Sequence, residues 1–136
     1  MTEIEFFMPM VPPSVTHQTQ AITVAKGKPR VYDTPELKEA REKLTAHLAK
    51  HRPAQKLTGA IKLTTVWVWP AANGHAAGDW KLTKPDTDNM VKLLKDCMTR
   101  LGFWKDDSQV ANELTEKLYG LKPGILVRVE QLPRTM

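Results

Sequence analysis

The chain has 136 residues, of which 41% are hydrophobic and 26% are charged, as is ordinary for a globular protein that buries a core. This length predicts one domain over residues 1–136, and the absence of any long apolar run excludes a membrane span and a signal peptide. The net charge of +5 favours a polyanionic partner, and a single cysteine excludes an internal disulfide, so we expect a protein of the reducing cytoplasm.

The first 32 residues predict three short strands. Residues 3–8 alternate between polar and apolar side chains and then turn apolar, which is typical of a strand, and Pro9 ends it. Two apolar segments, 22–25 and 30–32, flank a Lys-Gly-Lys-Pro sequence and predict a short hairpin with a basic tip. This tip fits a solvated turn and a phosphate-contacting loop equally well.

A helix is predicted to begin at Thr34 and Pro35, because threonine caps helix N-termini and proline favours the first helical position. Pro53 stops it near His51. Its buried face is predicted to be Leu37, Ala40, Leu44 and Leu48. His47 and His51 have the i, i+4 spacing of some zinc sites, but no third soft ligand is nearby. We therefore interpret both histidines as surface residues.

The second half of the chain predicts three further strands. Residues 60–69 show the clearest two-residue alternation of side chains in the sequence and predict a strand. The Ala- and Gly-rich residues 71–80 predict a loop. The periodicity of residues 110–119 fits both a helix and a strand. Because a turn and a strand over 125–132 follow, we predict that 110–119 is a strand and the hairpin partner of the last one. The elements together predict an α+β fold, with a mixed sheet packed against two main helices.

A second helix is predicted by an apolar stripe with spacings of three, one, three, one and three residues. The stripe comprises Met90, Leu93, Leu94, Cys97, Met98 and Leu101. The lone cysteine lies on this stripe, so we interpret it as a core residue. Gly102 stands where a left-handed C-cap is expected. The opposite face is charged, with Asp88 and Lys92 one turn apart.

Acidic residues stand at both ends of this helix. Asp86 and Asp88 mark its start, and Asp107 follows about 20 residues later, where a strand would return it to them. Three converging carboxylates fit Mg²⁺, with Mn²⁺ as a substitute, and such an ion activates water and stabilises phosphoryl charge. Lys92 would then contact a phosphate. The structural alternative is that an aspartate at a helix start is an ordinary cap, although two close carboxylates repel each other without a cation.

Two motifs resemble the RusA family of Holliday junction resolvases closely. The first, basic-Pro-Asp-x-Asp-Asn-x-x-Lys, occupies residues 84–92, and the second, Trp-x-Asp-Asp-x-Gln-Val, occupies residues 104–110. An early Pro-Pro-Ser at 12–14 also matches, so the resemblance covers most of the chain. Two features depart from the family. Residues 15–17 replace an asparagine that members often carry after this segment, and residues 71–80 look like an expanded loop.

This resemblance implies a RusA-like fold and a homodimeric, Mg²⁺-dependent endodeoxyribonuclease, bacterial or phage-encoded. It also implies symmetric nicking of four-way DNA junctions in DNA recombination and repair. The positions that match the family's metal-binding catalytic carboxylates are Asp86, Asp88 and Asp107. Lys92 matches its essential lysine, and Asp96 and Asp106 match acidic positions without an assigned role. A homodimer is physically sensible, because a two-fold axis supplies two equivalent sites for two matched cuts.

Basic residues outside the acidic cluster are candidates for contacts with DNA phosphates, so we expect affinity to fall steeply with salt. They are Lys26, Lys28, Arg30, Lys81 and Lys84. Two alternatives stay open: a nuclease for other branched DNA, and a non-catalytic protein that binds DNA junctions. The acidic cluster argues against the second, because a binding module gains nothing from carboxylates that face phosphate.

Overall fold

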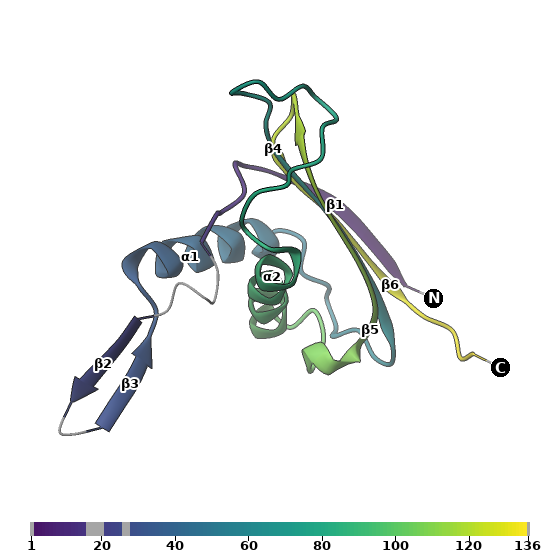
Figure 1. Cartoon of the computed structure of the whole chain (residues 1–136). Helices are drawn as coiled ribbons and strands as arrows, with labels where there is room; N and C mark the ends of the chain where they lie inside the picture. Colours follow the sequence, from purple (N-terminus) through teal and green to yellow (C-terminus); the bar gives the residue numbers. More distant parts are fainter. Residues whose placement is uncertain (1, 16–20, 26–27, 136) are drawn as a thin grey trace.

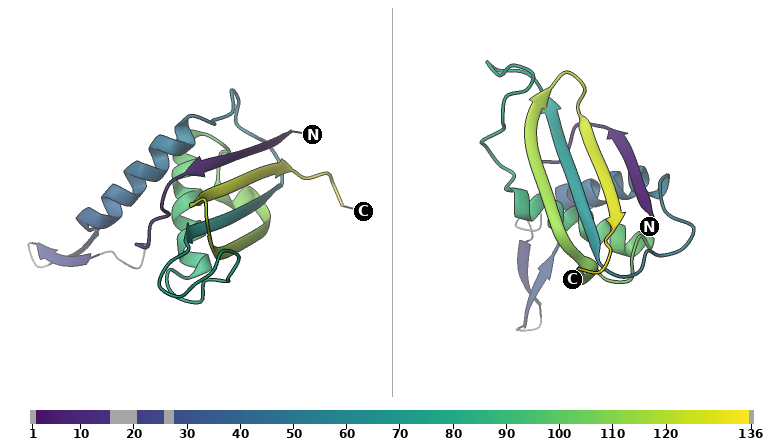
Figure 2. Two further views of the ribbon diagram at one scale, coloured as in Figure 1. Left: turned by 90° about the horizontal axis from the view of Figure 1, so that it is seen from above. Right: turned by 90° about the vertical axis from the view of Figure 1, so that its right-hand side faces the viewer.

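The computed structural model describes residues 2–15, 21–25 and 28–135, and it has the predicted α+β architecture (Figure 1). Four strands form a mixed sheet in the order β1-β6-β4-β5, and both helices lie on one face of it (Figure 2). The sheet strands are β1 (Glu3–Pro9), β4 (Ile61–Pro70), β5 (Val110–Gly120) and β6 (Gly124–Gln131), and the helices are α1 (Pro35–Ala49) and α2 (Thr87–Leu101). No helix of the described residues is long and apolar enough to cross a membrane.

A separate two-stranded sheet confirms the predicted N-terminal hairpin. β2 (Ala21–Ala25) and β3 (Lys28–Tyr32) pair antiparallel and extend away from the main sheet (Figure 1). α1 follows and begins at the predicted position, with the Leu37 N–H donating to Oγ1 of Thr34 at 3.3 Å. Its four predicted core residues are all buried. Of the predicted phosphate contacts here, Lys26 lies outside the described residues, whereas positions 28 and 30 are on β3.

The pairing of the last two strands differs from the sequence prediction. β5 and β6 both exist, but they do not form a hairpin. β4 lies between them, parallel to β5 and antiparallel to β6. Every second residue of β4 is fully or almost fully buried, so a central position suits it, whereas β5 has an exposed segment that suits an edge. Gly120, the last residue of β5, lies close to β4, since a Cβ on it would be 2.6 Å from Cγ1 of Val68.

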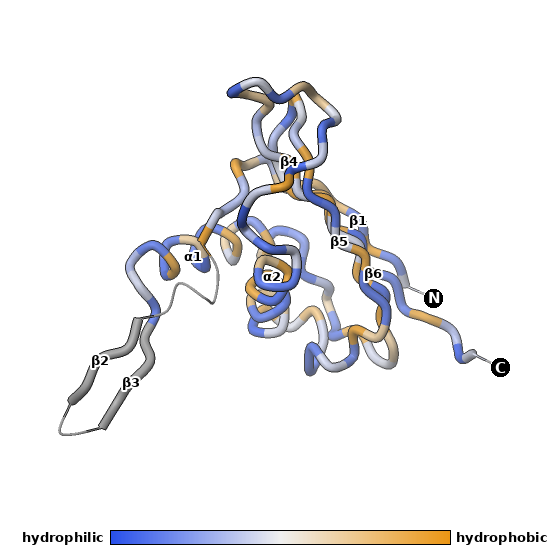
Figure 3. Tube along the Cα trace, in the orientation of Figure 1, coloured by the Kyte–Doolittle hydropathy of each residue, from blue (hydrophilic) through white to orange (hydrophobic). Residues whose placement is uncertain are grey.

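α2 packs against α1 and the sheet through its predicted apolar stripe. Five of the six stripe residues are buried, including Cys97, and Leu101 is half-buried. Val91 is buried as well, although it lies outside the predicted stripe. Gly102 has a φ of 83°, which confirms the left-handed C-cap, and the Phe103 N–H donates to the Met98 carbonyl at 3.1 Å. Hydropathy alternates along the strands that face these helices (Figure 3).

Candidate functional site

Asp86 stands at the N-cap position of α2 but does not cap it. Its backbone is extended, with φ −72° and ψ 147°, and its main-chain carbonyl accepts from the Met90 N–H at 3.1 Å. Its side chain makes no capping hydrogen bond and is exposed. The ordinary structural explanation of an aspartate at this position therefore does not apply, and the carboxylate faces solvent.

The segment before Asp86 is held by Lys117 of β5. Its Nζ donates to the carbonyls of Thr83 at 2.6 Å and of Pro85 at 2.7 Å. Burial lowers the pKa of Lys117 and the charge of Lys81 lowers it further, whereas Asp86 and then Tyr119 oppose this change. Lys117 thus places a cation beside Asp86. The sequence did not reveal this residue, because one lysine in a strand pattern carries no signal of what it contacts.

Lys81 adds a second cation to this segment, and it is held in place. Its Nζ donates to Oγ1 of Thr83 at 2.8 Å and lies 5.1 Å and 5.2 Å from the ring centroids of Trp69 and Tyr119. Lys84 is exposed. Of the two lysines predicted to contact DNA here, Lys84 is presented to solvent, whereas Lys81 is half-buried and supports the local structure.

Asp88 and Lys92 occupy the exposed face of α2, as the spacing predicted. Within residues 2–15, 21–25 and 28–135, neither side chain forms a hydrogen bond or an ion pair. Asp88 lines an open cavity of about 320 Å³ between α2 and β5, and Glu113 lines it from the strand. Oε1 of Glu113 lies 2.9 Å from Nζ of Lys95. Glu113 is therefore a second carboxylate on the Asp88 cavity, and the sequence motifs did not indicate it.

Asp107 lies beyond the other end of α2. It begins a 3₁₀ turn, η2 (Asp107–Gln109), which leads into β5, and Lys117 reaches the start of α2 only ten residues later. Because the 15 residues of α2 rise about 1.5 Å each, the two ends of the helix are roughly 22 Å apart, with Asp86 at one end and Asp107 beyond the other. Among the described residues, no three His, Cys, Asp or Glu side chains are grouped closely enough to hold a metal. The chain therefore brings Asp86 and Asp88 together but does not bring Asp107 to them.

Asp106 and Gln109 stabilise the turn around Asp107. The Asp106 carboxylate accepts from the Ser108 N–H at 3.0 Å, and this bond lowers the pKa of Asp106. Oε1 of Gln109 accepts from the Asp106 N–H at 3.2 Å, which completes a capping box. Nε2 of Gln109 donates to the carbonyls of Leu57 and Gly59, both at 3.1 Å. Asp106 and Gln109 of the motif at residues 104–110 thus have a structural role.

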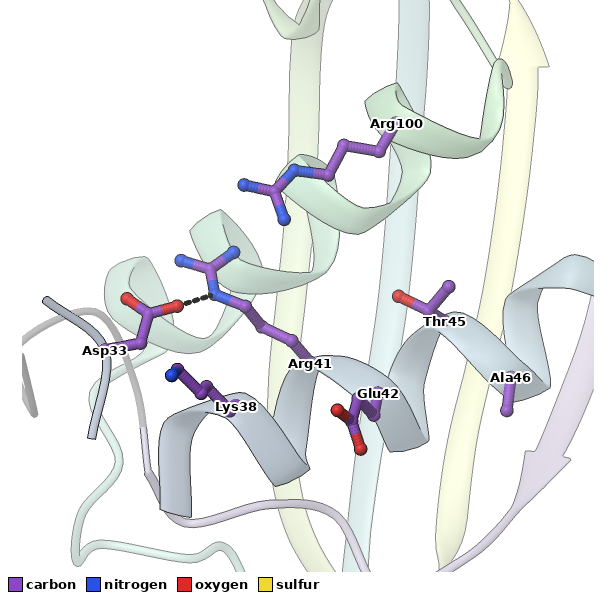
Figure 4. Close-up of a pocket in the computed structure, with 7 residues that line it drawn as sticks. All are labelled: Asp33, Lys38, Arg41, Glu42, Thr45, Ala46 and Arg100. Carbon is purple, nitrogen blue, oxygen red and sulfur yellow. Dashed lines mark hydrogen bonds and ion pairs between the residues drawn. The ribbon is translucent and has the colours of Figure 1, made fainter. Parts of the chain in front are cut away.

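Asp96 belongs to an ion-pair network between the helices. Its Oδ2 lies 4.0 Å from Nη1 of Arg41, whose Nε donates to Asp33 at 2.8 Å. A cavity of about 490 Å³ adjoins this network, and Figure 4 shows Arg41 turned towards Asp33 and Arg100 reaching over them from α2. Asp96 is therefore placed apart from the start of α2, on the side that faces α1.

Comparisons with known proteins agree with this arrangement of motifs. The family model described as endodeoxyribonuclease RusA matches residues 9–130. A protein of Lactococcus phage r1t, named crossover junction endodeoxyribonuclease rusA, is 29% identical over 132 residues, which cover 96% of this chain and 98% of that protein. The uncharacterized protein YqaN of Bacillus subtilis (strain 168) is 26% identical over 121 residues, or 81% of this chain and 84% of its own. With almost its whole length matched, this chain belongs to the family of RusA endodeoxyribonucleases.

Proposed function

We propose that this protein is a Mg²⁺-dependent endodeoxyribonuclease that resolves four-way DNA junctions by paired symmetric nicks, in DNA recombination and repair. Its place of action is the cytoplasm of a bacterium or of a phage-infected cell. The observation that carries the proposal is the uncapped, exposed carboxylate of Asp86. It stands two residues from the exposed Asp88, in a chain of the RusA family.

The donor set at the start of α2 fits Mg²⁺ or Mn²⁺. Mg²⁺ is usually bound through one or two carboxylates together with substrate phosphates and water, so Asp86 and Asp88 suffice to begin a site. Both carboxylates are exposed and are not used by the fold. A metal bound there would lower the pKa of a water molecule and offset charge on the phosphate. Asp107 is a third candidate ligand from the family motif, although within this chain it lies beyond the other end of α2.

Lysines on both sides of these carboxylates in the sequence are positioned to bind phosphates of the DNA backbone. Lys92 is exposed one turn after Asp88, and Lys84 is exposed two residues before Asp86. We assign phosphate binding to both, and Lys92 in addition stabilises negative charge that develops at the cut. Lys117 keeps its ammonium on the carbonyls of the preceding segment, so it fixes the position of Asp86 and raises the local positive potential.

Two matched nicks require two equivalent sites, and a two-fold homodimer supplies them. Contacts to phosphate position a protein on DNA without selecting sequence. Selection of a four-way junction then comes from the separation and direction of the two sites across the dimer. We therefore include the homodimer in the proposed function.

The test compares Asp86→Asn with the wild-type protein on a four-way junction, with and without Mg²⁺. The variant keeps the size of the side chain and removes the charge, so we expect junction binding within about twofold and no detectable cleavage. Glu36→Gln is the matched control, because Glu36 is an exposed carboxylate in the first turn of the other helix. This control should cut at the wild-type rate.

Each alternative predicts a different result in the same assay. Cleavage by Asp86→Asn at the wild-type rate contradicts the site, and equal cleavage of a fork and of the junction identifies a nuclease for other branched DNA. Junction binding by the pure wild-type protein without Mg²⁺-dependent cleavage identifies a non-catalytic binding protein. Asp107→Asn decides whether the third motif carboxylate acts in cleavage, since its loss should then match that of Asp86→Asn.

A further inference from the structure

Two large apolar side chains are exposed on the segment that leads to Asp86. Trp80 is 60% exposed and Leu82 is 89% exposed, whereas the other three tryptophans of the chain are buried. Trp80 ends the Ala- and Gly-rich segment of residues 71–80, and Leu82 follows it. Burying such side chains is favourable by about 1.5–3 kcal/mol each, so their exposure in a fixed position indicates a binding surface.

The backbone around Trp80 is fixed along the edge of β5. The Gly78 N–H donates to the Tyr119 carbonyl at 2.8 Å, and the Tyr119 N–H donates to the Asp79 carbonyl at 2.9 Å. The Lys81 N–H donates to the Lys117 carbonyl at 3.0 Å. Trp80 is therefore presented on a hydrogen-bonded frame. This frame is continuous with the Lys117 contacts that position Pro85 and Asp86.

The surface beside Trp80 is hollow, aromatic and flanked by cations. A cavity of about 470 Å³ is lined by Trp80, Leu82, His75 and Tyr119, among others. The rings of His75 and Tyr119 stack with their centroids 4.1 Å apart. Lys81 lies under Tyr119, and Lys84 is exposed two residues after Leu82. Aromatic faces next to lysines are the combination that binds unpaired nucleobases, because the ring stacks on the base while the cations hold the backbone.

We propose that Trp80 and Leu82 form a surface on which a nucleobase at the branch point of the DNA substrate stacks, next to the cut at Asp86. This inference rests on the proposed function and names the part of the substrate that the site selects. A four-way junction exposes base faces at its centre, whereas linear duplex keeps them stacked. The surface therefore favours branched DNA over duplex. The occupant is DNA rather than a second protein copy, because lysines flank the apolar surface and the segment continues directly into the carboxylate site.

Tryptophan fluorescence gives a direct test, since Trp80 is the one exposed tryptophan of the four. The measurement uses the full-length chain without added metal, so that the DNA stays intact. In the free protein, acrylamide should quench a component of the emission that Trp80→Phe lacks. Saturation with a four-way junction should lower the Trp80 emission. The Trp80 emission that is left should then be quenched less by acrylamide than in the free protein. A linear duplex of the same sequence, also at saturation, should have little effect on it.

Two substitutions separate stacking from apolar bulk. Trp80→Leu keeps an apolar side chain but loses the flat ring, and we expect junction binding to weaken roughly tenfold or more. Trp80→Phe keeps a ring and should weaken it much less. Binding of linear duplex should not change in either variant. Val11→Ala is the control for loss of exposed apolar surface, because Val11 is also half-exposed but precedes both helices, and its carbonyl accepts from Lys43 of α1.

Three outcomes overturn this inference. The first is unchanged Trp80 emission when the junction is bound, and the second is wild-type junction affinity in Trp80→Leu with an unchanged thermal midpoint. The third is a Trp80 that acrylamide cannot reach in the free protein, which would show that another copy covers it. These outcomes are independent of cleavage. A wild-type protein that fails to cut the junction with Mg²⁺ instead contradicts the proposed function.

Discussion

Two aspartates of this chain occupy the same kind of position and behave differently. Asp86 and Asp106 both stand immediately before a helical turn, with extended backbone. Asp106 accepts the Ser108 N–H as a cap does, whereas Asp86 makes no such bond. Its neighbour Lys117 holds the preceding carbonyls, and the Asp86 side chain is left exposed. The same residue type is therefore structural at one position and available for chemistry at the other.

The sequence could not separate these two roles, because both aspartates stand at the same kind of local position, and Lys117, which holds the segment before Asp86, lies 31 positions away from it. Local spacing predicts that a carboxylate lies at a helix start, and this prediction is confirmed for Asp86 and Asp88. It does not show whether the carboxylate turns towards the helix N–H groups or away from them. Lys117 and Glu113 join the site from β5, and only the packing of that strand beside α2 brings them there.

Lys117 leads to a prediction about pH. Its pKa is lowered, chiefly by burial and then by Lys81, so it loses its charge at a lower pH than an ordinary lysine. The positive charge beside Asp86 is present below that pKa and is lost as pH rises through it. Cleavage of a four-way junction should therefore decline on the alkaline side, and in Lys117→Arg this decline should move to higher pH, because arginine stays charged.

The measurement is the pH profile of the single-turnover cleavage rate, from neutral to about pH 10. Lys122→Arg is the matched control, since Lys122 is an exposed lysine in the turn after β5. Its profile should coincide with that of the wild-type protein. Coincident profiles for wild type and Lys117→Arg would mean that the charge of Lys117 does not contribute to cleavage.

At the scale of elements, α2 is the part that its own sequence specifies best. Its stripe, its acidic start and its C-cap were all predicted, and all are present. Each depends on residues within one or two turns, so no distant contact is needed to define them. The β5–β6 pairing was predicted wrongly for the opposite reason. Two strands separated by a short turn usually pair, but here β4, which comes 40 residues earlier, lies between them.

Gly102 gives a prediction for the end of α2. Its φ of 83° is a left-handed conformation, and a Cβ there would find its nearest neighbour, Cε of Lys56, at 3.6 Å. The cost of a side chain is therefore conformational rather than steric. Gly102→Ala should lower the free energy of unfolding by about 1–2 kcal/mol. Gly102→Asn should lower it less, because asparagine tolerates this region better.

Urea denaturation of both variants measures this difference. An unchanged m-value would show that only stability has changed. Equal midpoints for Gly102→Ala and the wild-type protein would mean that the end of α2 relaxes to another conformation at no cost. In that case the turn that leads to Phe103 and Trp104 would not be fixed by this glycine.

At the scale of the whole molecule, the four-stranded sheet depends on pairing between its first and last strands in the sequence, β1 and β6. β1 pairs with β6 in a continuous register from Glu3↔Glu130 to Pro9↔Gly124. Beyond this register, the Gln131 N–H donates to the Thr2 carbonyl at 3.0 Å. Gly124 lies tightly against β1, since a Cβ there would be 2.5 Å from the Met8 carbonyl oxygen. β6 is therefore the link between β1 and the rest of the sheet.

A truncation tests this dependence. Removal of residues 124–136 leaves β1 without a partner and exposes one edge of β4, so we expect loss of a cooperative thermal transition by circular dichroism. Removal of residues 133–136 is the control, because these residues follow the last strand. The short truncation should unfold cooperatively near the wild-type midpoint. A cooperative transition in the longer truncation would show that β1, α1 and α2 form a stable core without β6.

The β1–β6 pairing also has a consequence for synthesis on the ribosome. Translation produces β1 first and β6 last, at about 5–20 residues per second. The apolar β1 strand therefore emerges many seconds before the segment with which it pairs, and β4 emerges with neither of its neighbours present. We expect the sheet to form only after β6 has emerged, so nascent chains that still lack β6 should bind ribosome-associated chaperones. Ribosome-bound chains stalled before residue 124 should show this as chaperone binding that is lost from released, full-length protein.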